Sequence, residues 1–178
     1  MAEEIIMKNF YAVALFSFGL FLSACEQHNI AQNNTNTSAN RKVEIKKNDN
    51  GLTTLKSQNK FDETYSRLKK AIEGNDALTI ITELDHANNA TKTEMKLRPT
   101  KLIIFGNPKL GTPLMNENQT VGIDLPQKFL VYENEKSEVF VAYNDPMYLA
   151  RRHNLDEKRE EISKMYNALK GLAEAATR

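Results

Sequence analysis

The sequence predicts a single α/β (α+β) domain, a compact sandwich in which a mixed sheet of about five strands is covered by helices, mainly on one face. Two observations support this prediction. Short runs rich in β-branched residues alternate with segments whose apolar residues recur at helical spacing. The chain then ends in a long apolar stripe at the same helical spacing, which predicts a long C-terminal helix. Residues 51–178 are numerous enough to fold around one core, so we expect one domain there.

The first expected elements are a strand over residues 52–58 and the helix that follows it. Asn59 or Asp62 is a candidate N-cap for this helix, and Gly74 is expected to end it. The helix spacing places four apolar side chains on one face: Phe61, Tyr65, Leu68 and Ile72. This segment is therefore an amphipathic helix of about four turns.

Two further strands are expected on either side of a short helix. The β-branched run over residues 78–84 predicts the first of them. A short helix should begin at Asp85 or His86 and end near Met95. The apolar run over residues 101–105 predicts a second, more buried strand.

A hairpin and a final helix complete the expected fold. Residues 129–133 and 139–143 are two strand-like runs that flank a polar turn, which predicts a hairpin. Asp145 can then cap the amides of a following helix, with Pro146 at its first position. The last helix is expected from the stripe formed by Leu155, Ile162, Met165, Tyr166, Leu169, Leu172, Ala173 and Ala176.

The start of the chain has the order of a secretory signal. Lys8 precedes an apolar run over residues 10–22, and the small residues Ser23 and Ala24 stand directly before Cys25. A cysteine in this position resembles the lipobox of bacterial lipoproteins, in which the thiol receives a diacylglyceryl group. A retained membrane anchor is the alternative, but the apolar run is shorter than the roughly 20 residues that span a bilayer.

We therefore expect residues 1–24 to be a lipoprotein signal peptide, in which residues 1–6 are an upstream extension and Met7 is the true start. Residues 25–50 would be the lipidated Cys25 followed by a flexible polar tether, because they contain few apolar residues to bury. The protein would then be held to the membrane in the cell envelope. Glu26 resembles outer-membrane sorting, so in a cell with two membranes the domain would face the periplasm.

Composition excludes several functions. The formal net charge is +1, and acidic and basic residues alternate along the expected helices, so we expect no nucleic-acid partner. Cys25 is the only cysteine, so neither a disulfide framework nor a thiolate metal site is expected. No motif in the sequence requires a cofactor.

Four segments carry a resemblance to a known family. They are residues 84–87, the FGNP-x-x-GTPLM stretch over 105–115, residues 122–126, and the YNDPxYLxxRH stretch over 143–153. In this order they resemble the bacterial domain-of-unknown-function family 302, from about Gly51 to Leu155. The resemblance implies a compact α/β fold and a homodimer, but neither a reaction nor a ligand. An open sheet face or the Met165-Tyr166 surface is the candidate dimer contact.

The segment from Phe105 to Thr112 follows an expected strand and contains two glycines, so it invites comparison with a phosphate-binding loop. Such a loop needs a lysine directly after its second glycine, where this chain has Thr112. Pro108 and Pro113 also remove two amide donors. A rigid Asn-Pro turn that shapes the rim of a pocket is the favoured interpretation.

Polar residues at expected strand ends suggest a small-ligand or interaction site without a complete set of catalytic groups. The candidate binding residues are Asp85, His86, Asn107, Asp145 and Tyr148. The main hypothesis is a non-enzymatic module whose pocket is rimmed by Asp85, His86, Asn107 and Asp145. Helix capping by Asp85 and Asp145 is the competing explanation for those two residues.

The alternative hypothesis is a metal- or haem-associated protein, or an acid-base enzyme, centred on His86. Asp85 beside it could hold one imidazole tautomer. His86 and His153 are the only histidines after the tether, and their spacing matches no paired-histidine metal motif. The two residues are therefore weak candidate metal ligands.

Overall fold

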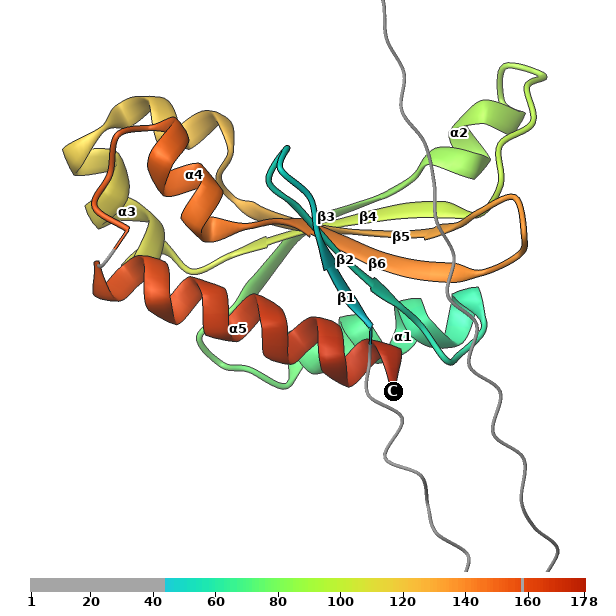
Figure 1. Ribbon diagram of the computed structural model, residues 1–178. Coiled ribbons are helices and arrows are strands. Elements are labelled where there is room, and N and C mark those ends of the chain that lie inside the picture. The colour runs from blue at the N-terminus through green and yellow to red at the C-terminus, as the bar shows by residue number, and fades with distance from the viewer. Residues whose placement is uncertain (1–43, 158) are drawn as a thin grey trace, which may run out of the picture. The chain divides into compact units, whose positions relative to one another are not determined.

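The computed structural model describes residues 44–157 and 159–178. The expected signal peptide, Cys25 and most of the expected tether lie outside the described residues. The described chain forms an α+β fold in which two helices pack against one face of an antiparallel sheet (Figure 1). The predicted fold class is confirmed.

Six strands form the sheet, in the order β1-β2-β6-β5-β4-β3. Every neighbouring pair is antiparallel. The strands are β1 (Ile45–Lys47), β2 (Leu52–Lys56), β3 (Thr79–Asp85), β4 (Thr100–Gly106), β5 (Gln127–Glu133) and β6 (Val139–Asn144). The sheet is therefore not mixed, and it has one strand more than expected.

The additional strand is β1, which lies inside the segment that we expected to be a flexible tether. Its three residues pair with β2 across a tight turn in which Gly51 has φ +81°. All three β1 residues are exposed, and two of them are lysines. Sequence patterns miss such a strand because a short, charged edge strand buries almost nothing.

Two helices cover one face of the sheet: α1 (Phe61–Glu73) and α5 (Glu160–Thr177). Between them and the sheet lies a core centred on Phe129, whose ring stacks on Phe105 at 5.3 Å and meets Tyr143 edge-on at 5.3 Å. The expected helical stripe of α1 is confirmed, except that its N-cap is Lys60, without a side-chain hydrogen bond. Leu155 is buried just before α5 rather than within it.

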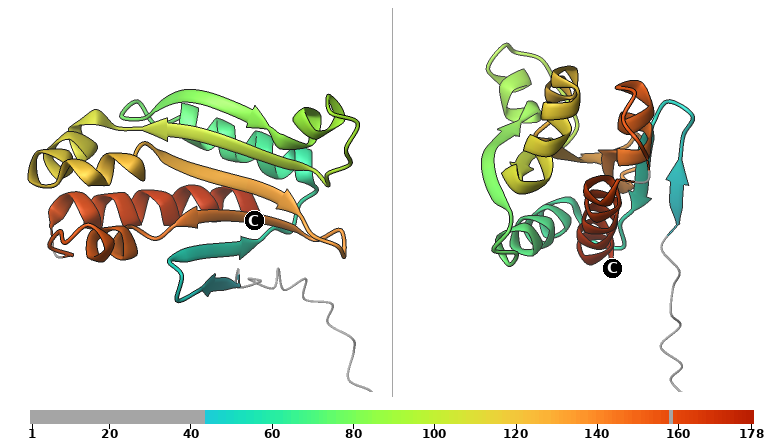
Figure 2. Two further views of the ribbon diagram at one scale, coloured as in Figure 1. Left: turned by 90° about the horizontal axis from the view of Figure 1, so that it is seen from above. Right: turned by 90° about the vertical axis from the view of Figure 1, so that its left-hand side faces the viewer.

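The remaining helices lie at the two ends of the sheet (Figure 2). At one end are α3 (Pro108–Glu117), the short 3-10 helix η1 (Gln119–Ile123) and α4 (Pro146–Arg152). At the other end is α2 (His86–Thr91), which is shorter than expected. No helix in the described part of the chain has the length and apolar character needed to cross a membrane.

The opposite face of the sheet carries a group of apolar side chains on β3 to β6, with polar side chains around them, and is not covered by a helix of the described chain (Figure 1). Strand register places Leu84, Leu102 and Leu130 side by side on it. The rings of Tyr132 and Phe140 stack there at 5.4 Å. All five side chains are partly exposed, which gives this protein the open sheet face that the sequence suggested.

Candidate functional site

The structure does not bring the four expected rim residues together. Asp85 ends β3 opposite Lys101, whereas Asn107 follows Gly106 at the far end of β4. Lys101 and Asn107 are six residue steps apart along the extended chain, a distance of about 20 Å at roughly 3.4 Å per residue. A single small molecule cannot contact both residues, so the pocket that we expected is not formed.

Asp85 caps a helix, as the competing explanation held. Its Oδ1 accepts a hydrogen bond of 2.8 Å from the amide of Asn88, and its Oδ2 lies 3.6 Å from the Lys101 ammonium. His86 is the first residue of α2 and is half-buried. Its imidazole has no hydrogen bond or ion pair within the described residues.

Asp145 also caps a helix, and it anchors the first hairpin. Its Oδ1 accepts a hydrogen bond of 2.9 Å from the amide of Met147, at the start of α4. Its Oδ2 contacts the Lys47 ammonium from β1. Tyr148 packs directly over Gly51, where an added Cβ would lie 2.2 Å from the ring. Asp145 and Tyr148 therefore hold the β1-β2 hairpin against α4.

His153 belongs to a buried polar cluster. Its Nε2 lies 2.6 Å from Asp124 Oδ2, and its Nδ1 lies 2.9 Å from the Thr120 hydroxyl. The Arg152 guanidinium donates to the other oxygen of Asp124 at 3.2 Å. Both imidazole nitrogens are thus occupied by protein groups, and the cluster ties the end of α4 to η1.

The described residues contain no group of three histidine, cysteine, aspartate or glutamate side chains that could hold a metal ion. His86 and His153 lie on different elements at opposite ends of the sheet. Neither histidine has, among the described residues, the further side chains that a metal ion would need as ligands. Within this part of the chain, no observation favours a metal centre on His86.

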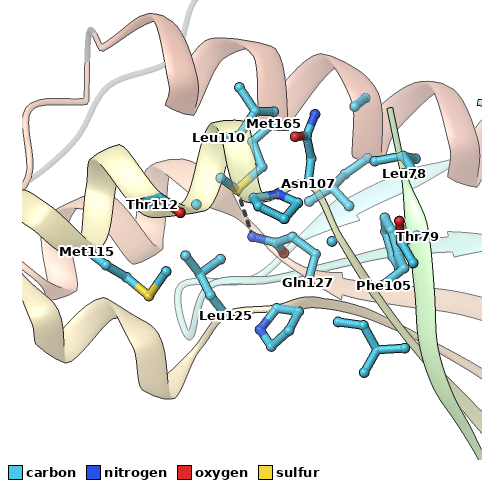
Figure 3. Close-up of a pocket in the computed structure, with 17 residues that line it drawn as sticks. Leu78, Thr79, Phe105, Asn107, Leu110, Thr112, Met115, Leu125, Gln127 and Met165 are labelled. Carbon is cyan, nitrogen blue, oxygen red and sulfur yellow. Dashed lines mark hydrogen bonds between the residues drawn. The ribbon is translucent and has the colours of Figure 1, made fainter. Parts of the chain in front are cut away.

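An apolar pocket of about 390 Å³ lies where α3, α5 and the ends of β3, β4 and β5 meet (Figure 3). Its lining consists of Leu78, Thr79, Ile81, Phe105, Gly106, Asn107, Pro108, Leu110, Gly111, Thr112, Met115, Leu125, Pro126, Gln127, Met165, Ala168 and Leu169. Asn107 is the one expected binding residue among them. The sequence predicts the stretch from Phe105 to Thr112 only as the rim of a pocket, and it does not reveal the lining residues outside this stretch, because the pocket joins segments that are distant along the chain.

The FGNP stretch forms the mouth of this pocket by starting a helix. Asn107 Oδ1 accepts a hydrogen bond of 2.9 Å from the amide of Lys109, and Pro108 is the first residue of α3. Gly106 permits a close approach, because an added Cβ would lie 3.3 Å from the Pro126 side chain. The stretch therefore shapes a pocket rim, as expected, although it does so through a helix that the sequence reading did not include.

The polar groups of the pocket are few and uncharged. Gln127 is only 7% exposed, and Figure 3 shows its amide among the apolar side chains, with the nitrogen 2.7 Å from Met165 Sδ. Asn107, Thr79 and Thr112 supply the other polar side chains. None of the lining residues carries a charge or titrates near neutral pH. This site can bind and orient a molecule, but its lining offers no acid or base.

A second, wider hollow lies at the opposite end of the sheet, beside α2. Five of its charged side chains are paired with each other. Lys101 lies 3.9 Å from Asp62 and 5.3 Å from the centre of the Tyr65 ring, besides its contact with Asp85. Lys56 bonds to Glu138 at 2.5 Å. With Lys60 and Glu133, which also line the hollow, three basic and four acidic side chains leave a formal charge of −1 there, which gives no strong selection for a charged ligand.

A cluster of titrating groups with shifted pKa values lies at the edge of the sheet near α1. Glu83 accepts hydrogen bonds from Lys69 at 2.7 Å and from Tyr65 at 2.6 Å. The Lys69 bond, followed by the Tyr65 bond, lowers the pKa of Glu83. Burial, followed by the bond to Glu83, raises the pKa of Tyr65. This cluster fixes α1 to β3 and lies outside both hollows.

One protein family matches most of the domain. Its model, described as "Domain of unknown function DUF302", aligns with residues 53–173. A crystal structure of an uncharacterised conserved DUF302 protein from Bacillus stearothermophilus superposes with a TM-score of 0.63. The two sequences are 19% identical, and the match covers 72% of this chain and 98% of that one. At this identity the likeness shows the fold alone.

Curated relatives are similar over a shorter region. "Fluoride-specific ion channel FluC 1" of Brucella suis biovar 1 (strain 1330) is 39% identical over 107 residues, which are 60% of this chain and 42% of that protein. "Fluoride-specific ion channel FluC 2" of Brucella melitensis biotype 1 is also 39% identical over 107 residues, which are 39% of its length. The chain thus spans about two fifths of the relatives that it matches.

Proposed function

This chain belongs to the DUF302 family, a domain of unknown function, and we propose that it is a non-enzymatic binding protein of the cell envelope that takes a small, neutral, largely apolar molecule. The pocket between α3, α5 and the sheet is the observation that carries this proposal. Its 390 Å³ falls within the range of small-molecule sites, about 300 to 1,000 Å³. Its lining has the usual composition of such sites, mostly apolar with a few polar groups.

The lining selects against charged molecules. A charge inside it would lose its hydration without gaining a partner of opposite sign, which costs several kcal/mol. The pocket therefore does not suit a fluoride ion. The Brucella relatives are named fluoride-specific ion channels, but this chain matches only about two fifths of their length. A neutral, apolar ligand loses little hydration free energy on entry. Burial of its apolar surface stabilises the complex by about 25 cal/mol per Å².

The proposed location rests on the sequence. Lys8, the apolar run over residues 10–22 and Cys25 are in lipoprotein order. A lipid on Cys25 would hold the pocket near a membrane, since each buried methylene contributes roughly 0.8 kcal/mol. Apolar molecules concentrate at such a surface, so an anchored protein with an apolar pocket would sit close to its ligand.

Filling the pocket tests the binding function. Ala168 lies on α5 and lines the pocket, and its side chain is half-buried. Ala168→Phe should place a ring inside the cavity and weaken binding of the neutral dye N-phenyl-1-naphthylamine at least tenfold. The measurement is a fluorescence titration of the purified full chain with this dye.

The matched control is Ala175→Phe, which makes the same change at an exposed position of the same helix. It should leave dye affinity unchanged. Equal affinities of Ala168→Phe and the wild type would show that the dye binds elsewhere, and this result would overturn the proposed site. Circular dichroism of both variants checks that the fold is retained.

A further inference from the structure

Gln127 is the most unusual polar side chain of the pocket, because it is buried without adequate hydrogen-bond partners. A carboxamide has two N–H donors and an oxygen that accepts two hydrogen bonds. The side chain of Gln127 is 7% exposed, yet its only hydrogen bond is the 2.7 Å contact from Nε2 to Met165 Sδ. A thioether is a weak acceptor, so this contact replaces little of the hydration that burial removes.

The identity of the two amide atoms follows from the Met165 contact. A thioether sulfur accepts hydrogen bonds but cannot donate them, so the nitrogen of Gln127 must face it. The carbonyl oxygen then points away from Met165. No donor among the described residues reaches this oxygen, and it is not one of the fully buried atoms that lack a partner. Oε1 is therefore an acceptor that remains open to the pocket.

Polar groups of buried side chains in folded proteins almost always have hydrogen-bond partners. The neighbouring Asn107 does satisfy this rule through its oxygen, which accepts from the amide of Lys109. Gln127 has no comparable structural role: it is the first residue of β5, and its side chain caps no helix. A bound molecule that donates a hydrogen bond to Gln127 Oε1 would explain why this oxygen has no donor within the protein.

We propose that Gln127 is the specificity-determining residue of the pocket, and that the ligand carries a hydrogen-bond donor on an otherwise apolar, neutral body. Alcohols, phenols and N–H amides have this chemistry. The inference rests on the proposed function, because it assigns the polar end of the molecule that the pocket would bind. It predicts that the pocket distinguishes two molecules of similar shape when only one of them has a donor.

The test compares 2-naphthol with 2-methoxynaphthalene, which has the same ring system but no donor, in calorimetric titrations of the full chain. Wild type should bind 2-naphthol three- to tenfold more tightly, as expected for one net hydrogen bond of about 0.6–1.4 kcal/mol. Gln127→Met keeps the length of the side chain and removes the amide. In this variant the two molecules should bind with equal affinity, so that the preference for 2-naphthol disappears.

Gln127→Leu provides a second apolar replacement if the methionine variant folds poorly, and Gln119→Met, at an exposed position, is the matched control. The control should retain the full preference for 2-naphthol. Equal binding of both molecules by the wild type, or a preference that survives in both Gln127 variants, would overturn the role of Gln127 and leave the binding function standing. Failure of the wild type to bind either molecule would overturn both proposals.

Discussion

His153 illustrates how a residue that resembles a catalytic or metal-binding group can have a structural role. Both of its ring nitrogens are hydrogen-bonded within the protein, to Asp124 and to Thr120. Asn118 also donates to the His153 carbonyl oxygen at 2.7 Å. The segment from Asn118 to Asp124, which makes these hydrogen bonds, continues directly into Leu125 and Gln127, and these two residues line the pocket. The cluster therefore holds one wall of the pocket in place from behind.

Removal of the His153 imidazole should destabilise the fold. His153→Leu leaves the buried Asp124 carboxylate with Arg152 as its remaining side-chain partner. Breaking a buried pair in this way costs about 3 kcal/mol. Urea denaturation followed by circular dichroism measures the change in the free energy of unfolding.

His86→Leu is the control for this prediction, because His86 is half-buried and has no hydrogen bond within the described residues. We expect its effect to stay within about 0.5 kcal/mol. A loss as large as that of His153→Leu would mean that His86 has a role which its contacts do not reveal. Equal stability of His153→Leu and the wild type would show that the buried cluster is not structurally important.

At the scale of single elements, α3 is the segment that the sequence least suggests. It contains Gly111 and Pro113 within ten residues, a composition that disfavours a helix. The helix nevertheless forms, because Asn107 caps it, Pro108 starts it, and Leu114 is buried in a small core beside α4 and α5. Tertiary packing here outweighs local preference.

A glycine in this helix offers a stabilising substitution. A Cβ added at Gly111 would lie 3.5 Å from Leu125 Cδ1 and 3.9 Å from Met115 Cε, which are ordinary packing distances. Gly111→Ala should therefore raise stability by about 1 kcal/mol, through the lower entropy of the unfolded chain and the new contacts. Thermal unfolding detects this change as a higher Tm.

Gly171→Ala in α5 separates these two causes. A Cβ added there meets nothing within 4 Å, so only helix propensity contributes. The same gain at both positions would indicate that packing at Gly111 adds nothing. A lower Tm for Gly111→Ala would contradict the close but unstrained fit that the structure shows.

At the scale of the whole molecule, the open sheet face bears on assembly. Leu84 is 39% exposed there, and the neighbouring side chains of Leu102, Leu130, Tyr132 and Phe140 are partly exposed. Contiguous apolar surface of this kind is typical of interaction sites. In the Met165-Tyr166 surface, the other candidate contact, Met165 is 6% exposed and lines the pocket, and Tyr166 is half-buried. The open sheet face is therefore the favoured contact for the homodimer that the family resemblance implies.

We predict that the protein forms a homodimer in which the open sheet faces of two copies pack together. When two copies are related by a twofold axis, the apolar side chains of this face in one copy meet the same side chains in the other. Leu130→Lys, on a central strand, would place a charge in this contact and should give a monomer. Light scattering coupled to size-exclusion chromatography measures the mass of each species.

Leu97→Lys is the control for the dimer, because Leu97 is 50% exposed in a loop outside the sheet. This variant should remain a dimer. A monomeric wild type, or a Leu130→Lys variant that stays dimeric, would contradict the prediction. The dimer prediction and the ligand proposal are independent, since Leu130 does not line the pocket.

Much of the fold follows from the sequence alone. The face of α1, the β5-β6 hairpin and the Asp145 cap of α4 are each encoded by residues close together in the chain. Periodicity and capping act over a few residues, so they can be recognised without knowledge of the tertiary structure. The sequence also carries the family resemblance and the order of a lipoprotein signal, which lies outside the described residues.

The candidate site was decided by the tertiary structure. The sequence placed Asp85 and Asn107 at strand ends, but only the antiparallel register puts them at opposite ends of the sheet. Likewise, nothing near Gln127 in the chain reveals that its amide faces Met165, 38 residues away, in an apolar pocket. Local patterns determine which elements form, whereas a pocket depends on contacts between distant segments, and these are fixed only when the elements pack together.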